Sequence, residues 1–305
     1  MVKLNCGREL YLDHNRIKGD ENMIIVDCKK VNITKFPNNE VLIKGDQFWK
    51  KSGQTSYIRF KFENNEDLIN LMFIKKHLDE MGVKSILTIL YMPYSRMDRT
   101  EGQTVFTLKY ICKFINDLNF DKVEVHEPHS DVTLALLDRA TAVNMTQIIT
   151  TEAIRMLDFN EENDDYLFYP DAGAEKRYSK QIKWDKILTG IKERDFKTGW
   201  IKKLDVVGEV PKNQFRAIIV DDLCSKGGTF MMSAKKLRDL GATEVYLVVT
   251  HCENSIYDGD ILKTDLIDKV FTTTSILDNI DNDKIKMIIN SAWSSDYEEV
   301  YEFSK

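Results

Sequence analysis

The chain has 305 residues, of which 43% are hydrophobic and 30% are charged, and its formal net charge is -6. Its length predicts two domains of about 150 residues each, and its negative charge argues against non-specific binding to nucleic acid. The five cysteines show no zinc-like spacing, no signal peptide opens the chain, and no apolar run reaches the roughly 18 residues of a membrane span. We therefore expect a cytoplasmic protein that does not enter a membrane.

The first half alternates short apolar runs with segments of helical spacing. Residues 57–62 alternate in polarity, as a half-buried strand does, and 67–81 carry apolar residues three and four apart before Gly82. A turn over 35–41 feeds another short strand. By the same patterns we expect strands over 23–26, 85–90 and 122–125 and helices over 106–118 and 146–158.

Two polar segments of the first half follow expected strands. Residues 91–99 place two arginines and an aspartate where a strand ends, and α/β proteins hold ligands at the carboxyl ends of their strands. A solvated charged loop is the alternative. Residues 126–131 hold two histidines and two acids, which could ligate a metal. Their spacing fits no zinc motif, and a surface turn is the alternative there.

An acidic stretch over 160–165 is the best candidate for a domain boundary. We therefore expect domains over 1–158 and 159–305. Strands over 166–169 and 186–188 resume the alternation in the second half. Because strands and helices alternate in both halves, we predict an α/β fold of two domains, each a mostly parallel sheet flanked by helices.

Two features early in the second half suggest chemistry. The strand at 166–169 ends in a loop-to-helix turn that has a carboxylate, Asp171, at its mouth. The apolar pattern then lapses over 190–203, which is cationic and bounded by glycines. A mobile basic flap over a polyphosphate is one interpretation of this stretch, and a plain surface loop is the other.

One later stretch combines an acidic strand end with a glycine loop. Asp221 and Asp222 follow a buried-strand pattern at 217–220, and the loop 223–229 leads into a helix and a further strand at 245–249. Glycines let backbone amides converge on a phosphate. Two carboxylates beside a phosphate need other partners, which ribose hydroxyls or Mg²⁺ would supply. The stretch predicts a ribose phosphate site, and a generic strand-to-helix turn is the alternative.

Together these segments resemble the phosphoribosyl pyrophosphate synthetases, or ribose-phosphate pyrophosphokinases, over most of the chain. The matching motifs lie at 36–40, 93–99, His129, 170–173, 192–194 and 220–229. The resemblance implies two phosphoribosyltransferase-like domains with the active site between them. It also implies an ATP-dependent diphosphokinase that transfers the β,γ-diphosphate of Mg-ATP to the C1 hydroxyl of ribose 5-phosphate. The products would be phosphoribosyl pyrophosphate (PRPP) and AMP, and Mg²⁺ would be the cofactor.

The resemblance assigns a role to each matching residue. Lys192 and Arg194 would form a flexible catalytic pair that closes on the transferring phosphorus, and His129 and Asp171 would lie around Mg²⁺. The residues expected to bind ATP are Phe36, Asn38, Glu40, Arg96, Asp98 and Arg99. Asp221 and Asp222 would bind the ribose hydroxyls, and the 5-phosphate would be cradled by Ser225, Lys226, Gly227, Gly228 and Thr229. The first three ATP residues would come from a neighbouring subunit, so we expect a homo-oligomer, a dimer or larger.

Two departures mark the chain as a divergent member of that family. Met97 stands where the family usually has glutamine, after Arg96. The phosphate loop carries Ser225 and Lys226 in place of the usual Asp and Thr. This changes the local charge by about +2 and favours a more anionic ligand. The acceptor could therefore be larger than ribose 5-phosphate, for instance ADP-ribose in NAD metabolism, or Lys226 could merely point to solvent.

Two other functions are compatible with part of the pattern. A phosphoribosyltransferase would explain the acid pair and the glycine loop, but it would not require the motifs at 93–99 and 192–194, and the chain is long for it. A regulatory homologue that binds nucleotide without turnover is the second alternative. The retention of Lys192, Arg194, His129 and Asp171 argues against it.

Overall fold

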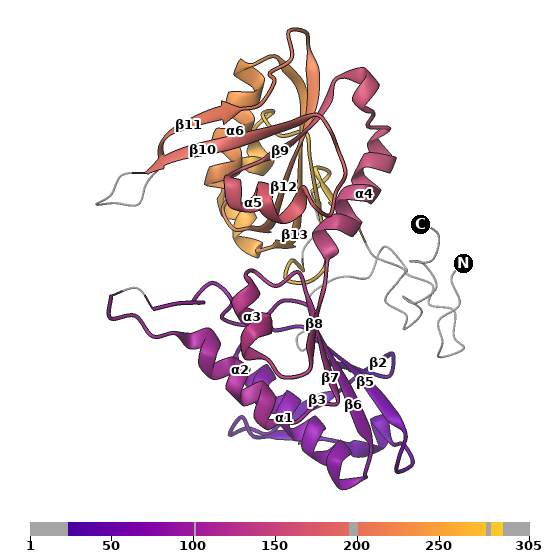
Figure 1. The fold of residues 1–305 in the computed structure, drawn as a ribbon. Helices are drawn as coiled ribbons and strands as arrows, with labels where there is room; N and C mark the ends of the chain where they lie inside the picture. The colour runs from indigo at the N-terminus through magenta and orange to yellow at the C-terminus, as the bar shows by residue number, and fades with distance from the viewer. Residues whose placement is uncertain (1–23, 101, 195–200, 279–281, 289–305) are drawn as a thin grey trace. The chain divides into compact units, whose positions relative to one another are not determined.

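The structure is a computed structural model that describes residues 24–100, 102–194, 201–278 and 282–288. The chain divides at Val143–Asn144 into two compact units, each with its own sheet and core (Figure 1). The division lies ahead of helix α4 (Met145–Leu157), whereas the acidic stretch suggested a boundary after it. Helix α4 packs on the strands of the second unit and therefore belongs to it.

Unit 1 contains a six-stranded sheet in the order β2-β1-β5-β6-β7-β8. Strands β5 to β8 run parallel, and β1 pairs antiparallel with both β2 and β5. The strands are β1 (Ile24–Val26), β2 (Lys29–Lys30), β5 (Thr55–Phe60), β6 (Lys84–Ile89), β7 (Lys122–His126) and β8 (Ala140–Val143). The helices are α1 (Asn65–Glu80), α2 (Thr107–Asp117) and α3 (Asp131–Leu136).

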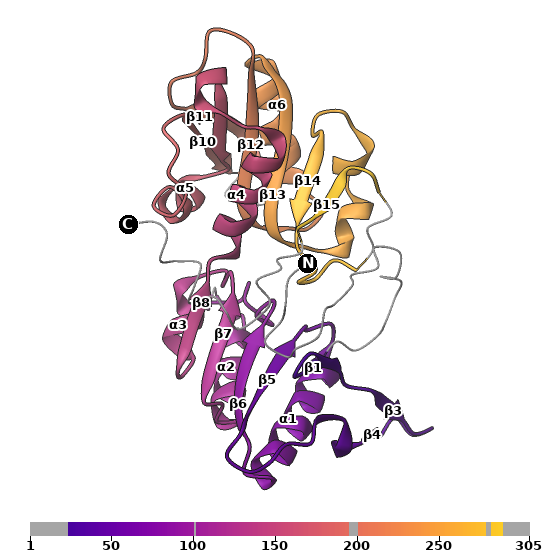
Figure 2. The same cartoon turned by 90° about the vertical axis from the view of Figure 1, so that its right-hand side faces the viewer.

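Helix α1 begins at a capping box. The side chain of Asn64 accepts a hydrogen bond from the amide of Glu66, and Asp67 accepts one from the amide of Asn64. A separate antiparallel hairpin, β3 (Ile33–Lys35) and β4 (Val41–Ile43), extends from unit 1 and is followed by the 3-10 helix η1 (Gly45–Phe48) (Figure 2).

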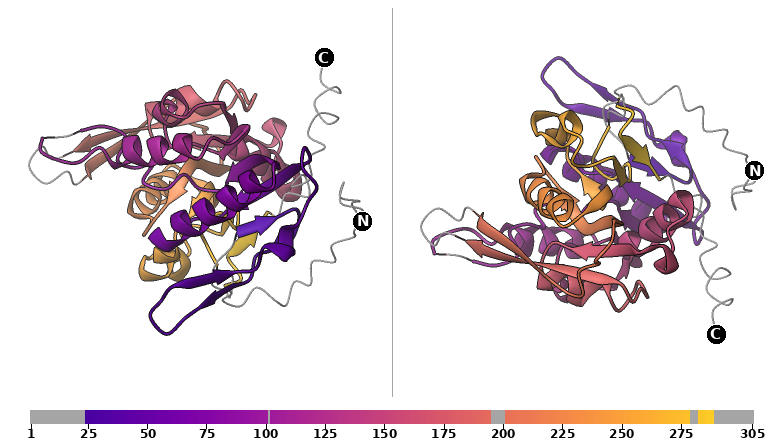
Figure 3. Two further views of the ribbon diagram at one scale, coloured as in Figure 1. Left: turned by 90° about the horizontal axis from the view of Figure 1, so that it is seen from below. Right: turned by 90° about the horizontal axis from the view of Figure 1, so that it is seen from above.

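Unit 2 contains a seven-stranded sheet in the order β11-β10-β9-β12-β13-β14-β15. All neighbours run parallel except β10 and β11, which form an antiparallel hairpin that reaches out from the unit (Figure 3). The strands are β9 (Asp165–Tyr169), β10 (Ile187–Arg194), β11 (Ile201–Val207), β12 (Phe215–Cys224), β13 (Ala242–Cys252), β14 (Lys269–Thr272) and β15 (Ile285–Met287). Besides α4, the helices are α5 (Ala172–Tyr178) and α6 (Gly228–Asp239), with 3-10 turns η2 (Glu161–Asn163), η3 (Asn254–Asp258) and η4 (Ile261–Lys263).

Both faces of the second sheet are covered, which explains the continuous apolar run of its central strand. Along β12, Ala217 and Ile219 point into the core beneath α6, whereas Ile218 and Val220 point into the core beneath α4 and α5. A strand buried on both faces reads as an unbroken apolar segment. The prediction of α/β domains with mostly parallel sheets flanked by helices is confirmed. None of the described helices combines the length and the apolar character needed to cross a bilayer.

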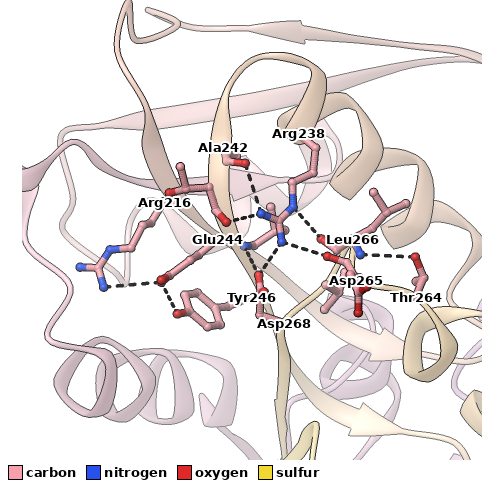
Figure 4. Close-up of polar contacts among 12 residues, drawn as sticks. Arg216, Arg238, Ala242, Glu244, Tyr246, Thr264, Asp265, Leu266 and Asp268 are labelled. Atoms are coloured by element: carbon pink, nitrogen blue, oxygen red, sulfur yellow. Dashed lines mark hydrogen bonds and ion pairs between the residues drawn. The ribbon is translucent and has the colours of Figure 1, made fainter.

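Two arginines, Arg216 and Arg238, hold together the end of this sheet that lies away from the acid pair. Figure 4 shows the contacts of Arg238 and the ion pair of Arg216 with Glu244. Arg216 forms two hydrogen bonds of 2.8 and 2.6 Å to the carboxylate of Asp165, which is fully buried. Arg238 donates to Asp268 at 2.7 Å and to the carbonyl oxygens of Asp265 and Leu266. Guanidinium groups suit this task because they offer several donors in a fixed plane.

The described residues of the stretch 190–203 are paired as strands in place of an irregular loop, and the role of this stretch as a flap stays a prediction. Residues up to Arg194 continue β10, and those from Ile201 form β11, with 195–200 outside the described residues. The hairpin carries charged residues such as Lys192, Lys203 and Asp205, so it lacks the apolar alternation by which strands are found in a sequence. Its backbone pairing defines it instead.

Candidate active site

The acidic residues of unit 2 gather where β9 and β12 end. Ile219 pairs with Phe168 in the parallel register, so Asp221 lies level with the turn that follows β9. That turn is Pro170–Asp171, and it leads directly into α5. The carboxyl edge of a parallel sheet is where α/β proteins place their ligand sites.

Asp171 has both carboxylate oxygens engaged. Its Oδ1 accepts the amides of Gly173 at 3.0 Å and Ala174 at 3.1 Å, which makes it the N-cap of α5. Its Oδ2 lies 2.9 Å from the Nζ of Lys192. Burial alone would raise the pKa of Asp171, but the hydrogen bond from Lys192 and the two amides outweigh it and lower that pKa.

A close backbone approach explains how Lys192 reaches this turn. A Cβ atom on Gly190 would lie 2.6 Å from the carbonyl oxygen of Pro170, so only glycine lets β10 run this near to the turn. Two residues further on, the side chain of Lys192 is 9% exposed and points to Asp171. Arg194, its predicted partner, ends β10, and its side chain lies outside the described part of the chain.

Asp221 and Asp222 form a crowded acid pair. Burial raises the pKa of Asp221 to about 8, with further contributions from the negative charges of Asp222 and Asp171. Asp222 is itself 7% exposed, and its amide donates to Asp221 at 3.0 Å. Such a pair favours ligands that bring hydrogen-bond donors or a cation.

The same carboxylates could donate oxygen ligands to Mg²⁺. Carboxylate oxygens are the ligands that Mg²⁺ prefers, and Asp171, Asp221 and Asp222 supply them at one edge. No group of three or more His, Cys, Asp or Glu side chains in the described ranges is arranged to hold an ion alone. Mg²⁺ would fit here if a bound phosphate completed its coordination, as it commonly does in phosphoryl-transfer sites.

The glycine loop follows β12 and opens onto the first turn of α6. Gly227 has φ +80°, and a Cβ atom there would lie 2.1 Å from the Cδ1 of Ile261, so this position requires glycine. A Cβ on Gly228 would meet nothing within 4 Å, which leaves the start of α6 open to a ligand. Thr229 lies half-buried in that turn, and Lys226 is exposed and makes no ion pair with any described residue. Open amides at a helix start suit an anion.

A second segment, 253–261, supports the glycine loop from the end of β13. The amide of Glu253 donates to the carbonyl of Cys224 at 2.8 Å, and Ser225 and Ser255 share a hydrogen bond of 3.0 Å. Gly259 approaches the carbonyl of Lys226 so closely that a Cβ would lie 2.1 Å from it. Glu253 and Ser255 could not be found from the sequence, because they belong to no motif and follow a different strand.

The expected adenine contacts sit on the turn of the β3–β4 hairpin in unit 1. Phe36 is 48% exposed, and Asn38 and Glu40 are also exposed. The amide of Phe36 donates to the carbonyl of Glu40 at 2.8 Å, and the side chain of Asn38 accepts from the amide of Glu40 at 3.2 Å. The hairpin therefore brings the three residues together on one exposed turn.

The other expected residues of unit 1 follow two of its parallel strands. Arg96 and Arg99 are exposed in the segment after β6, and Arg99 lies 3.7 Å from the partly buried Asp98. His129 is half-buried in the bend between β7 and α3. It belongs to unit 1 and Asp171 to unit 2, so their joint role around Mg²⁺ stays a prediction.

Comparisons with known proteins agree on one group of enzymes. A family model described as phosphoribosyl synthetase-associated domain matches residues 193–295. The ribose-phosphate pyrophosphokinase of Pyrococcus abyssi is 30% identical over 229 residues, which cover 72% of this chain and 75% of that protein. The ribose-phosphate pyrophosphokinase of Mycoplasma genitalium is 27% identical over 266 residues, covering 82% and 78%.

A solved structure supports the fold. The phosphoribosylpyrophosphate synthetase from Mycobacterium smegmatis matches with a TM-score of 0.67 and 16% identity, and 85% of each chain is covered. At 16% identity the match is evidence for the fold alone, and it confirms the architecture that the sequence motifs implied.

Proposed function

We infer that this chain, which belongs to the ribose-phosphate pyrophosphokinase family and is a diphosphotransferase, moves the β,γ-diphosphate of Mg-ATP onto the C1 hydroxyl of ribose 5-phosphate. The products are PRPP and AMP. The observation that carries this proposal is the ion pair of Lys192 and Asp171, which stands at the sheet edge that also holds Asp221 and Asp222. A cation beside carboxylates, at a sheet edge where β12 also leads into a glycine loop, suits a reaction between two phosphorylated substrates.

The acceptor would lie along the end of β12. Asp221 and Asp222 would accept the ribose hydroxyls, because a crowded carboxylate pair gains most from donors. The amides from Gly227 to Thr229 would hold the 5-phosphate at the start of α6. Ser225 and Lys226 complete the loop.

Transfer of the diphosphate requires little covalent chemistry from the protein side chains. Alignment of the hydroxyl with the phosphorus and neutralisation of developing charge supply most of the rate. Lys192 is aimed by its pairing with Asp171, and Arg194 follows on the same strand. Mg²⁺, when bound near Asp171 and His129, would neutralise phosphate oxygens.

The nucleotide side would use unit 1. Arg96, Asp98 and Arg99 would hold the phosphates of ATP, and Met97 replaces one contact that relatives make with glutamine. The exposed turn of Phe36, Asn38 and Glu40 would contact the adenine of the ATP that is bound to a neighbouring subunit. The active form would therefore be a homo-oligomer. Cys112, Cys224 and Cys252 are unbridged thiols, which agrees with a cytoplasmic location.

The mass of the product tests this proposal. Incubation with Mg²⁺, ATP and ribose 5-phosphate should release AMP and form PRPP in equal amounts. Release of AMP without any acceptor, or no AMP at all, would contradict it. Conversion of PRPP and a nucleobase to a nucleotide would instead favour a phosphoribosyltransferase, and nucleotide binding without any product a regulatory homologue.

Lys226 favours a second candidate acceptor. Its exposed ammonium has no described ion-pair partner and stands where relatives carry a neutral residue, so the loop suits a ligand with more than one phosphate. ADP-ribose has that character, and diphosphate transfer to it would yield ADP-ribose pyrophosphate. Comparison of ADP-ribose with ribose 5-phosphate as acceptors tests this candidate. A strong preference for ribose 5-phosphate that Lys226→Ala leaves unchanged would exclude it.

A further inference from the structure

Three side chains form a hydrogen-bonded chain behind the glycine loop. The Oγ of Ser225 lies 3.0 Å from the Oγ of Ser255, and Ser255 donates at 3.0 Å to the Oε2 of Glu253. Ser255 lies in the 3-10 helix η3, directly after β13, and Ser225 lies directly after β12. The two strands pair in parallel register up to Cys224 and Cys252, which brings both segments together.

The direction of these hydrogen bonds follows from the number of protons. A serine hydroxyl has one proton to donate, and an ionised carboxylate can only accept. The proton of Ser255 is committed to Glu253. Ser225 must therefore donate in the bond that the two serines share.

This arrangement leaves Ser225 as an acceptor toward anything that enters the site. Its proton is used, and no described N–H or O–H group donates to its Oγ. A fully ionised phosphate offers only acceptors, whereas a sugar hydroxyl can donate. Ser225 is half-buried, so one side of it remains open to a ligand.

We propose that Ser225 accepts a hydrogen bond from a sugar hydroxyl of the acceptor, and that Ser255 and Glu253 are positioning residues that keep it an acceptor. The proposal rests on the function inferred above and refines the role of one loop residue within it.

Binding measurements with two probes test the proposal. Ser225→Ala removes the acceptor and should weaken the affinity for ribose 5-phosphate by about 10-fold, the effect of one hydrogen bond, and change the affinity for inorganic phosphate by less than about twofold. Ser255→Ala frees the proton of Ser225 and should weaken the affinity for ribose 5-phosphate by a smaller factor, between about twofold and 10-fold. Ser255→Thr keeps a hydroxyl and should bind both probes as the wild type does. In a Ser225→Asp background the acceptor no longer depends on Ser255. Ser255→Ala should then weaken the affinity for ribose 5-phosphate by less than about twofold.

Calorimetric titration and a thermal unfolding curve of each variant give the required readouts. Equal losses for ribose 5-phosphate and inorganic phosphate would overturn the proposal, because Ser225 would then serve the phosphate. If Ser255→Ala weakens the affinity for ribose 5-phosphate equally in the wild type and in the Ser225→Asp background, the proposal is also overturned, because Ser255 would then have only a structural role. If the variants discriminate between the probes as expected but wild-type protein forms no PRPP, the proposal stands and the inferred diphosphate transfer fails.

Discussion

Lys192 and Asp171 form an ion pair of 2.9 Å that joins the middle of one strand to the turn after another. The side chain of Lys192 is 9% exposed, and the other oxygen of the carboxylate caps α5. The cation is therefore fixed by the sheet. Its position depends on Gly190, which allows β10 to pass the carbonyl of Pro170.

Replacement of Lys192 by alanine should lower kcat by about 10²–10³, because a cation aimed at developing charge is lost. AMP release in the presence of ribose 5-phosphate measures the effect. Lys203→Ala is a matched control, since Lys203 lies on the neighbouring strand in an exposed pair with Asp205 at 2.7 Å. Turnover of the Lys192 variant within twofold of the control would contradict the assignment.

The acid pair predicts that Asp221→Asn stabilises the protein by an amount that depends on pH. The pKa of Asp221 is about 8 in the native protein, against about 3.9 for an unfolded aspartate. Between these values the native state holds a proton that the unfolded state lacks, so rising pH destabilises the wild type relative to a variant that does not titrate. The free energy of unfolding of Asp221→Asn should exceed that of the wild type by a margin that grows from about pH 4 to about pH 8.

Urea unfolding of the ligand-free proteins across that range measures this margin. The slope should not exceed about 1.4 kcal/mol per pH unit, the limit for one proton. The margin near pH 4 serves as the baseline, because the native protein already holds the proton of Asp221 there. A margin that stays constant or shrinks as pH rises would show that the native pKa of Asp221 is not raised.

The two neighbouring glycines of the loop should respond differently to alanine. Gly227→Ala places a Cβ against the buried Ile261 at a positive φ, and it should cost about 1–3 kcal/mol of stability. Gly228→Ala meets no neighbour and should leave the unfolding midpoint nearly unchanged. Its methyl group would enter the open space at the start of α6, where the 5-phosphate is proposed to bind, so it should weaken the binding of ribose 5-phosphate. Wild-type affinity in Gly228→Ala would mean that the phosphate binds elsewhere.

Loss of the buried partner of Arg216 should destabilise unit 2 strongly. Asp165→Ala leaves a guanidinium without its two charged hydrogen bonds, at a cost of about 3 kcal/mol or more. Chemical unfolding measures the change. Glu152→Ala removes an exposed pair with Arg155 on α4 and should shift the midpoint little. Similar losses of unfolding free energy in both variants would show that the burial of an ion pair does not determine how much it stabilises the protein.

Much of unit 2 could be predicted because its signals are local. The apolar run of β12, the acid pair and the glycines lie within a dozen consecutive residues, and the structure joins them as one strand, one loop and one helix start. Strands β8, β14 and β15 and helix α3 escaped prediction because three- to six-residue elements carry too little periodicity.

The contacts that organise the site could not be predicted from the sequence. Lys192 meets Asp171 only because of the register between β9 and β10, and Ser225 meets Ser255 only because β12 pairs with β13. A sequence states which residues follow one another along a strand, whereas register is decided by the packing of the whole sheet.

The pairing of β12 with β13 also links two segments that lie far apart in the sequence. Ser225 and Ser255 stand 30 residues apart in the chain, yet they share a hydrogen bond. A carboxylate that follows β13 therefore sets the direction of a hydrogen bond in the loop that follows β12. A substitution in either segment changes the polarity of the other, so the two strand ends act as one unit.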